Sequence, residues 1–154
     1  MFKKVFMDIA IRIAKESKCK SRQVGAVLVK DGVLLASGYN GPPKGARHCD
    51  PCYRKVHEIP SATRLEFCRG LHAEQNAILQ CQSRILGAEL YCTNFPCVTC
   101  AKMLIQWEVE TVYYLNEYPD ELARKMLDES TTNVYHINGD GCILQDIGKE
   151  GMSV

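Results

Sequence analysis

His72-Ala73-Glu74 and Pro96-Cys97-Val98-Thr99-Cys100 are the two stretches around which this sequence is organised. Each precedes apolar residues at helical spacing, which are Ala77, Ile78 and Cys81 after the first and Ala101, Leu104 and Ile105 after the second. Pro96 suits the place just ahead of a first helical turn because it has no N–H to leave unbonded. Residues 88–93 have the composition of a strand. The sequence therefore predicts two helices that each begin at a motif, with a strand between them.

The second motif supplies two thiols on one side of a helix. Cys97 and Cys100 are three residues apart, so both sulfur atoms project in the same direction. At a helix N-terminus the dipole lowers the pKa of a thiol toward the thiolate that a metal needs. His72, at the start of the other helix, would be a third ligand. Three protein ligands with one open position are typical of a catalytic zinc.

Glu74 stands two residues after His72, close enough to reach the open position of the zinc without occupying it. There it would take a proton from a zinc-activated water and pass it to the substrate. A C-x-x-C pair also occurs in redox centres and structural zinc sites, but those interpretations leave His72, Glu74 and Pro96 unexplained. The pattern H-x-E followed by P-C-x-x-C is the signature of zinc-dependent nucleobase deaminases.

Length and composition favour a single domain over residues 1–154 and give no sign of a polyanion-binding surface. The formal net charge is +1, and charges of both signs are scattered along the chain. We therefore expect neither a nucleic-acid partner nor a membrane partner. The first residues do not resemble a secretory signal, and nine cysteines in such a chain favour metal binding and catalysis over disulfides. We expect a cytoplasmic protein.

The rest of the chain predicts a mixed sheet between helices. Apolar residues from Phe2 to near Ser17 predict an amphipathic helix, and Asp31-Gly32 between apolar runs predicts a β-hairpin. Strands over 111–115 and 133–137, with a helix over 119–129, predict a parallel right-handed crossover. The order α-β-β-α-β-α-β-α-β gives an α/β protein of three layers, α/β/α, with a five-stranded sheet whose last two strands are parallel. We expect a loosely ordered tail from about residue 140.

Gly38-Tyr39-Asn40-Gly41-Pro42-Pro43-Lys44-Gly45 is a loop by its glycine and proline content. This loop and the two motifs together closely resemble the deoxycytidylate (dCMP) deaminases of bacteria, phages and eukaryotes, over about residues 22–114. The resemblance implies the cytidine-deaminase fold and the zinc-dependent hydrolysis of dCMP to dUMP and ammonia, with Glu74 as the proton carrier. It also implies that Asn40 hydrogen-bonds the sugar of the nucleotide.

The resemblance implies further properties that the residues themselves do not indicate. The dCMP deaminases are often homo-oligomers, commonly hexamers. They are activated by dCTP, which would bring Mg²⁺ with it, and they are inhibited by dTTP.

A cysteine-rich insert over residues 46–70 has no clear periodicity and is long for a connection inside a domain. Our hypothesis is a second, structural zinc bound by Cys19, Cys49, Cys52 and Cys68, with His48 as an alternative ligand. Some deaminases that this chain resembles carry an extra zinc near such an insert, whereas the human-like branch lacks it. The alternative is a set of free thiols in a mobile loop that covers the substrate.

The substrate is less firmly indicated than the reaction. Four cations flank the expected pocket loops and are candidates for binding a phosphate, namely Lys20, Arg22, Lys44 and Arg47. A tRNA adenosine deaminase is the nearest rival of the same chemistry, although the loop at 38–45 fits the nucleotide enzymes better. The rival of another class is a non-catalytic, zinc-stabilised module that senses nucleotides or binds partners. Glu74 argues against that rival, because a purely structural site has no use for this carboxylate.

Overall fold

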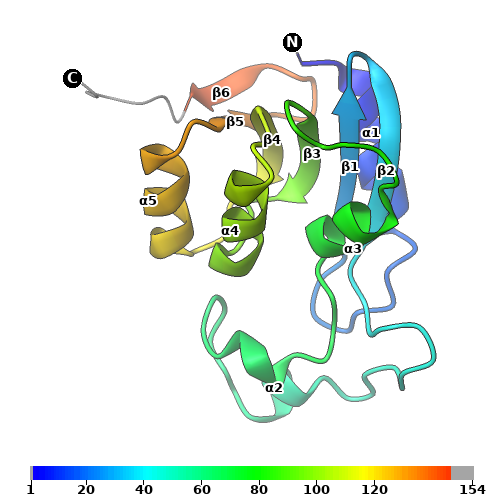
Figure 1. Ribbon diagram of the computed structural model, residues 1–154. Coiled ribbons are helices and arrows are strands. Elements are labelled where there is room, and N and C mark those ends of the chain that lie inside the picture. The colour runs from blue at the N-terminus through cyan, green and yellow to red at the C-terminus, as the bar shows by residue number, and fades with distance from the viewer. Residues whose placement is uncertain (1, 147–154) are drawn as a thin grey trace.

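A single six-stranded sheet runs through residues 2–146, the part of the chain that the computed structural model describes (Figure 1). Its strands are β1 (Gly25–Lys30), β2 (Val33–Tyr39), β3 (Glu89–Asn94), β4 (Thr111–Asn116), β5 (Asn133–Ile137) and β6 (Ile143–Asp146). Their spatial order is β2-β1-β3-β4-β5-β6. The central strands β3, β4 and β5 are parallel, whereas β1 is antiparallel to both β2 and β3. The expected parallel pairing of the strands at 111–115 and 133–137 is confirmed.

Helices cover both faces of the sheet and give the expected three layers. Helix α1 (Lys4–Ala14) lies on one face, and α3 (Ala73–Gln80), α4 (Val98–Gln106) and α5 (Glu121–Glu129) lie on the other (Figure 1). The insert contains the short helix α2 (Tyr53–Val56) and the turn of 3₁₀ helix η1 (Leu65–Phe67), and α2 lies beyond the edge of the layers. Among the described helices, none is both long and apolar enough to cross a bilayer.

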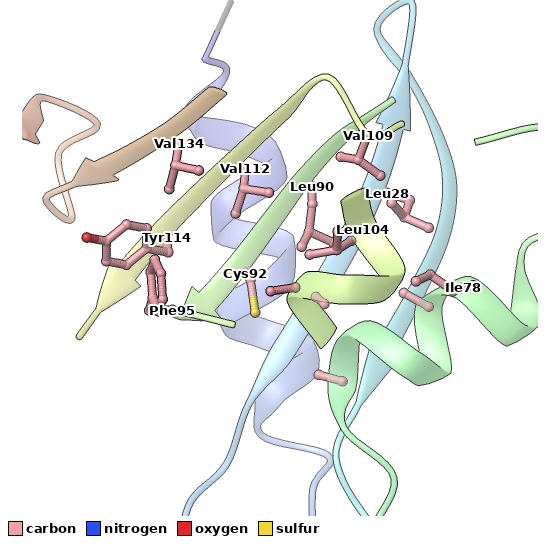
Figure 2. Packing of buried hydrophobic residues seen from close by; sticks show 14 of the residues in the cluster. Leu28, Ile78, Leu90, Cys92, Phe95, Leu104, Val109, Val112, Tyr114 and Val134 are labelled. Atoms are coloured by element: carbon pink, nitrogen blue, oxygen red, sulfur yellow. The ribbon is translucent and has the colours of Figure 1, made fainter. Parts of the chain in front are cut away.

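Alternation along the strands divides the core into two clusters, because successive side chains point to opposite faces. Val27 and Tyr91 face α1 and pack with Phe6. Leu28 and Leu90 face the other way, toward α3 and α4, and belong to the larger cluster (Figure 2). These strands are buried on both sides, which matches their continuous apolar runs.

The hairpin between β1 and β2 confirms the turn predicted at Asp31-Gly32. Both residues have positive φ, 51° and 74°, which is the conformation of a type I′ turn and matches the twist of the strands. The loop after β2 lies at the end of the sheet where α3 begins. A β-bridge between Gly41 and Leu71 joins this loop to the residues just before α3.

Gly38 allows α3 to lie directly on β2. A Cβ atom at this position would stand 2.4 Å from the Ala73 carbonyl oxygen and 2.5 Å from the Ala77 nitrogen. Any side chain would therefore push the helix away from the sheet. Because α3 begins immediately after His72, this close contact sets the height of that histidine above the strands.

The predicted number of strands was wrong, because β6 forms within the segment that we expected to be loosely ordered. It pairs antiparallel to β5 and makes the sheet six-stranded. The side chain of Asn138 closes the intervening turn by accepting from the Asp140 and Cys142 backbone N–H groups at 3.1 and 2.8 Å. Ile143 is 54% exposed, so this edge strand lacks the buried apolar run that predicts inner strands. The rest of the expected tail, 147–154, lies outside the described residues.

Candidate metal centre and active-site cavity

His72, Cys97 and Cys100 converge between two helix N-termini. His72 is the N-cap of α3, and its backbone N–H donates to the Gln75 Oε1 atom at 2.8 Å. Cys97 is the N-cap of α4, and Cys100 lies in the first turn of that helix. The Nδ1 atom of His72 lies 3.2 Å from the Cys97 sulfur and 3.3 Å from the Cys100 sulfur. The strand between the two helices, β3, has therefore brought the two motifs together as predicted.

The three ligand atoms fit one zinc ion. They all lie within 4.8 Å of one another, and no other group of three potential ligands among residues 2–146 does so. A tetrahedral zinc with bonds of about 2.3 Å to sulfur and about 2.0 Å to nitrogen separates sulfur from nitrogen by about 3.5 Å. The observed distances are close to that value. A two-thiolate, one-imidazole set leaves a fourth position for water or substrate.

The pKa values of the three ligands favour a negative charge on Cys97, which suits the binding of a cation. Hydrogen bonds from Cys100 and His72 lower the pKa of Cys97 to about 4, so this sulfur is a thiolate at neutral pH. The hydrogen bond to Cys97 and burial raise the pKa of Cys100 well above its ordinary value. The contact with Cys97 raises the pKa of His72. The Cys97 sulfur is thus stabilised by hydrogen bonds from its two neighbours, and a bound cation would take the place of those hydrogen bonds.

Glu74 lies in the first turn of α3 and is 5% exposed. Burial raises the pKa of its carboxyl group, because a charge is costly away from water. The fully buried Cys92 of β3 donates from its thiol to the Glu74 Oε1 atom at 3.5 Å. Figure 2 shows Cys92 on β3, the strand that follows α3 and precedes α4 in the chain. Glu74 is thus a buried carboxyl group that interacts electrostatically with His72 and Cys97.

A cavity of about 310 Å³ adjoins the metal centre. His72, Glu74 and Cys97 are part of its lining, together with Phe95 and Tyr118. Four cationic residues line the same cavity, namely Lys18, Arg22, Arg54 and Lys55. Arg22 is the one member of the predicted cation set that lines it, and Lys20, Lys44 and Arg47 are absent from its described walls.

Arg22 is half-buried and is held in place by neighbours in the cavity wall. Its guanidinium carbon lies 4.9 Å from the centre of the Tyr118 ring, and Nη2 donates to the Ser61 hydroxyl at 3.4 Å. The Tyr118 hydroxyl in turn accepts from the Ala62 backbone N–H at 3.0 Å. The insert therefore contributes to the cavity wall beside Arg22 through Ser61. These contacts could not be predicted from the sequence, because the insert has no regular pattern that would place it against the cavity.

Asn40 lines the cavity but has a structural role of its own. Its Oδ1 atom accepts from the Val24 N–H at 2.8 Å, and its Nδ2 atom donates to the Arg22 carbonyl at 3.0 Å. The side chain thereby fixes the backbone from which the Arg22 side chain extends. One amide hydrogen and one lone pair are still available, so a substrate contact is compatible with these bonds.

Three cysteines of the insert, together with Cys19, line the cavity but are not gathered as tightly as the catalytic set. The cavity lining includes Cys19, Cys49, Cys52 and Cys68. Burial raises the pKa of Cys49, and the other three thiols add to this effect, so the four are electrostatic neighbours. No three of their sulfur atoms lie within 4.8 Å of one another in the part of the chain that the structure describes.

Comparison with known sequences places the chain among deaminases. A family model described as the cytidine and deoxycytidylate deaminase zinc-binding region matches residues 2–116. Deoxycytidylate deaminase of Schizosaccharomyces pombe is 39% identical over 117 residues, which are 73% of this chain and 36% of that protein. Deoxycytidylate deaminase of Mycobacterium phage D29 is 39% identical over 121 residues, which are 73% of this chain and 92% of the phage protein. The chain thus spans about a third of the yeast relative and most of the phage relative.

A solved structure agrees with these sequence matches. The dCMP deaminase of cyanophage S-TIM5, in complex with dCMP and dUMP, is 34% identical and superposes with a TM-score of 0.74. The match covers 89% of this chain and 100% of the phage chain. The fold expected from the motifs is therefore confirmed.

Proposed function

Because the chain belongs to the cytidine and deoxycytidylate deaminase family, we propose that it hydrolyses dCMP to dUMP and ammonia. The observation that carries this proposal is the buried carboxylate of Glu74 beside a three-ligand metal centre, in a cavity with cationic residues in its wall. The first feature supports hydrolytic deamination, and the second supports a substrate that carries a phosphate. Two relatives that the chain matches over most of their length, from Mycobacterium phage D29 and cyanophage S-TIM5, are named for the same activity.

His72, Cys97 and Cys100 would hold the zinc, which when bound is a Lewis acid that lowers the pKa of a water toward neutrality. Glu74 would take the proton from the water that attacks C4 of the cytosine ring, and deliver it to the adjacent ring nitrogen. A second transfer through the same carboxylate would carry the remaining proton of the added hydroxyl to the amine, so that the C4–N bond breaks, the C4 carbonyl forms and ammonia leaves. A raised pKa suits Glu74 to both roles, because a group that titrates nearer neutral pH can accept and return a proton.

The test is an assay of zinc-loaded protein with dCMP, in which the formation of dUMP and ammonia is measured. We expect conversion of dCMP, and no deamination of an adenosine in an RNA stem-loop. Turnover of the stem-loop alone would leave the zinc chemistry intact but replace the substrate with that of a tRNA adenosine deaminase. If neither compound reacts, the non-catalytic alternative of a nucleotide-sensing module is favoured.

The 5′-phosphate is the feature that distinguishes dCMP from deoxycytidine, and we propose that Arg22 binds it. The guanidinium of Arg22 lines the cavity, and two contacts fix its direction. Ser61 and Tyr118, which contact the Arg22 guanidinium, also line the cavity, and each hydroxyl has a proton to donate to a phosphate oxygen. Arg54 is a less suitable candidate, because its side chain already donates to the carbonyls of Arg64 and Pro60 at 2.6 and 2.8 Å.

Replacing Arg22 with glutamine should lower kcat/KM for dCMP by about 10- to 100-fold, since a hydrogen bond to a charged group contributes about 1.5–3 kcal/mol. The value for deoxycytidine should hardly change. Steady-state kinetics with both compounds measure the difference. Lys20→Gln is the matched control, because Lys20 is two residues away, exposed and outside the cavity lining. An equal loss for dCMP and deoxycytidine would assign Arg22 a structural role.

We also propose that the insert binds a second, structural zinc through Cys19, Cys49, Cys52 and Cys68, with His48 as the alternative fourth ligand. The four thiols line one cavity and interact electrostatically, which supports the proposal. A modest closing of the insert would be needed to bring the sulfurs to the spacing of a tetrahedral site.

Metal analysis of the purified protein should find about two zinc ions per chain, because a closed four-cysteine site binds zinc tightly. The double variant Cys49→Ser/Cys52→Ser should retain one. Cys142→Ser, at an exposed cysteine outside the cavity lining, is the control and should keep both. A value of one zinc per chain in the unaltered protein would refute the structural site and leave the insert with free thiols.

The family resemblance supports three further proposals that the same preparations can test. We propose that Asn40 donates a hydrogen bond to the sugar of the nucleotide. We also propose that the protein forms a homo-hexamer. Finally, we propose that dCTP with Mg²⁺ activates turnover and that dTTP inhibits it. Light scattering gives the mass of the assembly. Assays with each nucleotide added to dCMP give the effects of the two regulators.

A further inference from the structure

Asp120 joins the N-termini of two helices. It is 8% exposed and stands in the loop between β4 and α5. Its Oδ1 atom accepts from the Ala123 N–H of α5 at 3.0 Å, and its Oδ2 atom accepts from the Val98 N–H of α4 at 2.8 Å. The first N–H groups of a helix have no partner within the helix. One carboxylate therefore caps its own helix and a second helix that lies 22 residues earlier in the chain.

The helix that Asp120 reaches is the one that carries both thiolate ligands. Val98 directly follows Cys97, so the bond to its N–H fixes the peptide group that links the two residues. Cys100 lies in the same first turn, and the Cys97 carbonyl accepts from the Ala101 N–H at 2.8 Å. A rotation of this turn would move both sulfur atoms relative to His72.

The last residue of β4, just before this loop, also secures the chain ahead of Cys97. The Asn116 carbonyl accepts from the Phe95 N–H at 2.8 Å, and the Asn116 side chain donates to the Thr93 carbonyl at 2.8 Å. The segment 93–98 is thus held on one side by the end of β4 and on the other by Asp120. These contacts surround the metal-binding turn without including any of its ligands.

We propose that Asp120 is a positioning residue for the metal centre, which fixes the first turn of α4 so that the Cys97 and Cys100 sulfurs stand at binding distance from His72. A negative charge at this helix N-terminus is also favourable to the helix dipole. The proposal concerns the zinc affinity of the chain and does not depend on which nucleotide it deaminates. Groups that orient metal ligands typically contribute 10- to 100-fold to metal affinity.

Two variants separate positioning from ordinary capping. Asp120→Ser retains a good N-cap for α5, because a serine oxygen can accept from the Ala123 N–H, but it has no second oxygen for Val98. Asp120→Asn has one acceptor oxygen, and its NH₂ group would face one of the two N–H donors. Thr132→Val is the matched control, because it removes a buried hydrogen bond to the Val109 carbonyl, 2.8 Å long, just beyond the C-terminal end of α5.

The test is competition of each zinc-loaded full-length variant with a chelator, with circular dichroism to verify the fold. The zinc content of Cys97→Ser is subtracted from that of each variant, because this variant retains only the zinc that is bound outside the His72, Cys97 and Cys100 centre. We expect Asp120→Ser and Asp120→Asn to be folded and to bind zinc about 10- to 100-fold more weakly, with Thr132→Val unchanged. Unaltered affinity in the Asp120 variants would overturn the proposal. An equal loss in Thr132→Val would also overturn it, because it would attribute the effect to general stability.

Discussion

Replacing Glu74 with glutamine should abolish detectable turnover of dCMP while the protein stays folded and keeps its zinc. Glutamine has nearly the same shape, but its amide cannot accept a proton from water or return one to the ring. A positioned general acid–base group contributes about 10²- to 10⁴-fold, and Glu74 would act in two successive transfers, so we expect a loss of about 10³-fold or more. Initial rates with excess enzyme measure the residual activity.

The control for this variant is Glu129→Gln, an exposed residue at the end of α5 that should retain full activity. Zinc content and circular dichroism of Glu74→Gln should match those of the unaltered protein, because the side chain is not a ligand and its volume is kept. A variant with substantial turnover would rule out the proton-transfer role. Loss of zinc instead would indicate that Glu74 supports the metal centre and not only the reaction.

Replacing Cys97 with serine should remove the catalytic zinc and lower the melting temperature. The thiolate that Cys97 supplies is the ligand whose charge the site already stabilises. Zinc present at about 1,000 times its dissociation constant stabilises the folded state by about 4 kcal/mol. For a domain of this size, that corresponds to about 8–16 °C. Metal analysis and thermal unfolding, with and without added zinc, provide the two measurements.

Cys142→Ser is again the appropriate control, since it removes an exposed thiol outside the centre. It should have the same melting temperature as the unaltered protein and bind the same amount of zinc. If Cys97→Ser retained all of its zinc and its melting temperature, the three-ligand centre of His72, Cys97 and Cys100 would be wrong. His72→Ala should behave like Cys97→Ser, because each leaves two ligands.

The metal centre could be predicted from the sequence because its residues are local to two helix starts. Cys97 and Cys100 share one turn, and His72 and Glu74 share another, so their spacing alone nearly fixes their directions. Only one long-range contact had to be inferred, and β3 supplies it by joining the two motifs. The hairpin at Asp31-Gly32 was similarly predictable, since its conformation depends on two adjacent residues.

The features that were not predicted depend on contacts between distant segments. Asp120 looks in sequence like an ordinary helix cap, and its bond to Val98 exists only because α4 and α5 lie side by side on one face of the sheet. Arg54 reaches the cavity through an insert with no periodicity. β6 is a short edge strand with an exposed Ile143, so it lacks the buried apolar run that predicts an inner strand.

The ratio of kcat/KM for dCMP to kcat/KM for deoxycytidine, measured on zinc-loaded protein, tests the central claim most directly. Both compounds present the same base to the metal centre, so a difference in kcat/KM between them reports the binding of the 5′-phosphate. We predict a ratio of about 100 or more, since Arg22 and the adjacent hydroxyls would each bind a charged oxygen. A ratio near one, or faster turnover of deoxycytidine, would contradict the assignment of this chain as a dCMP deaminase.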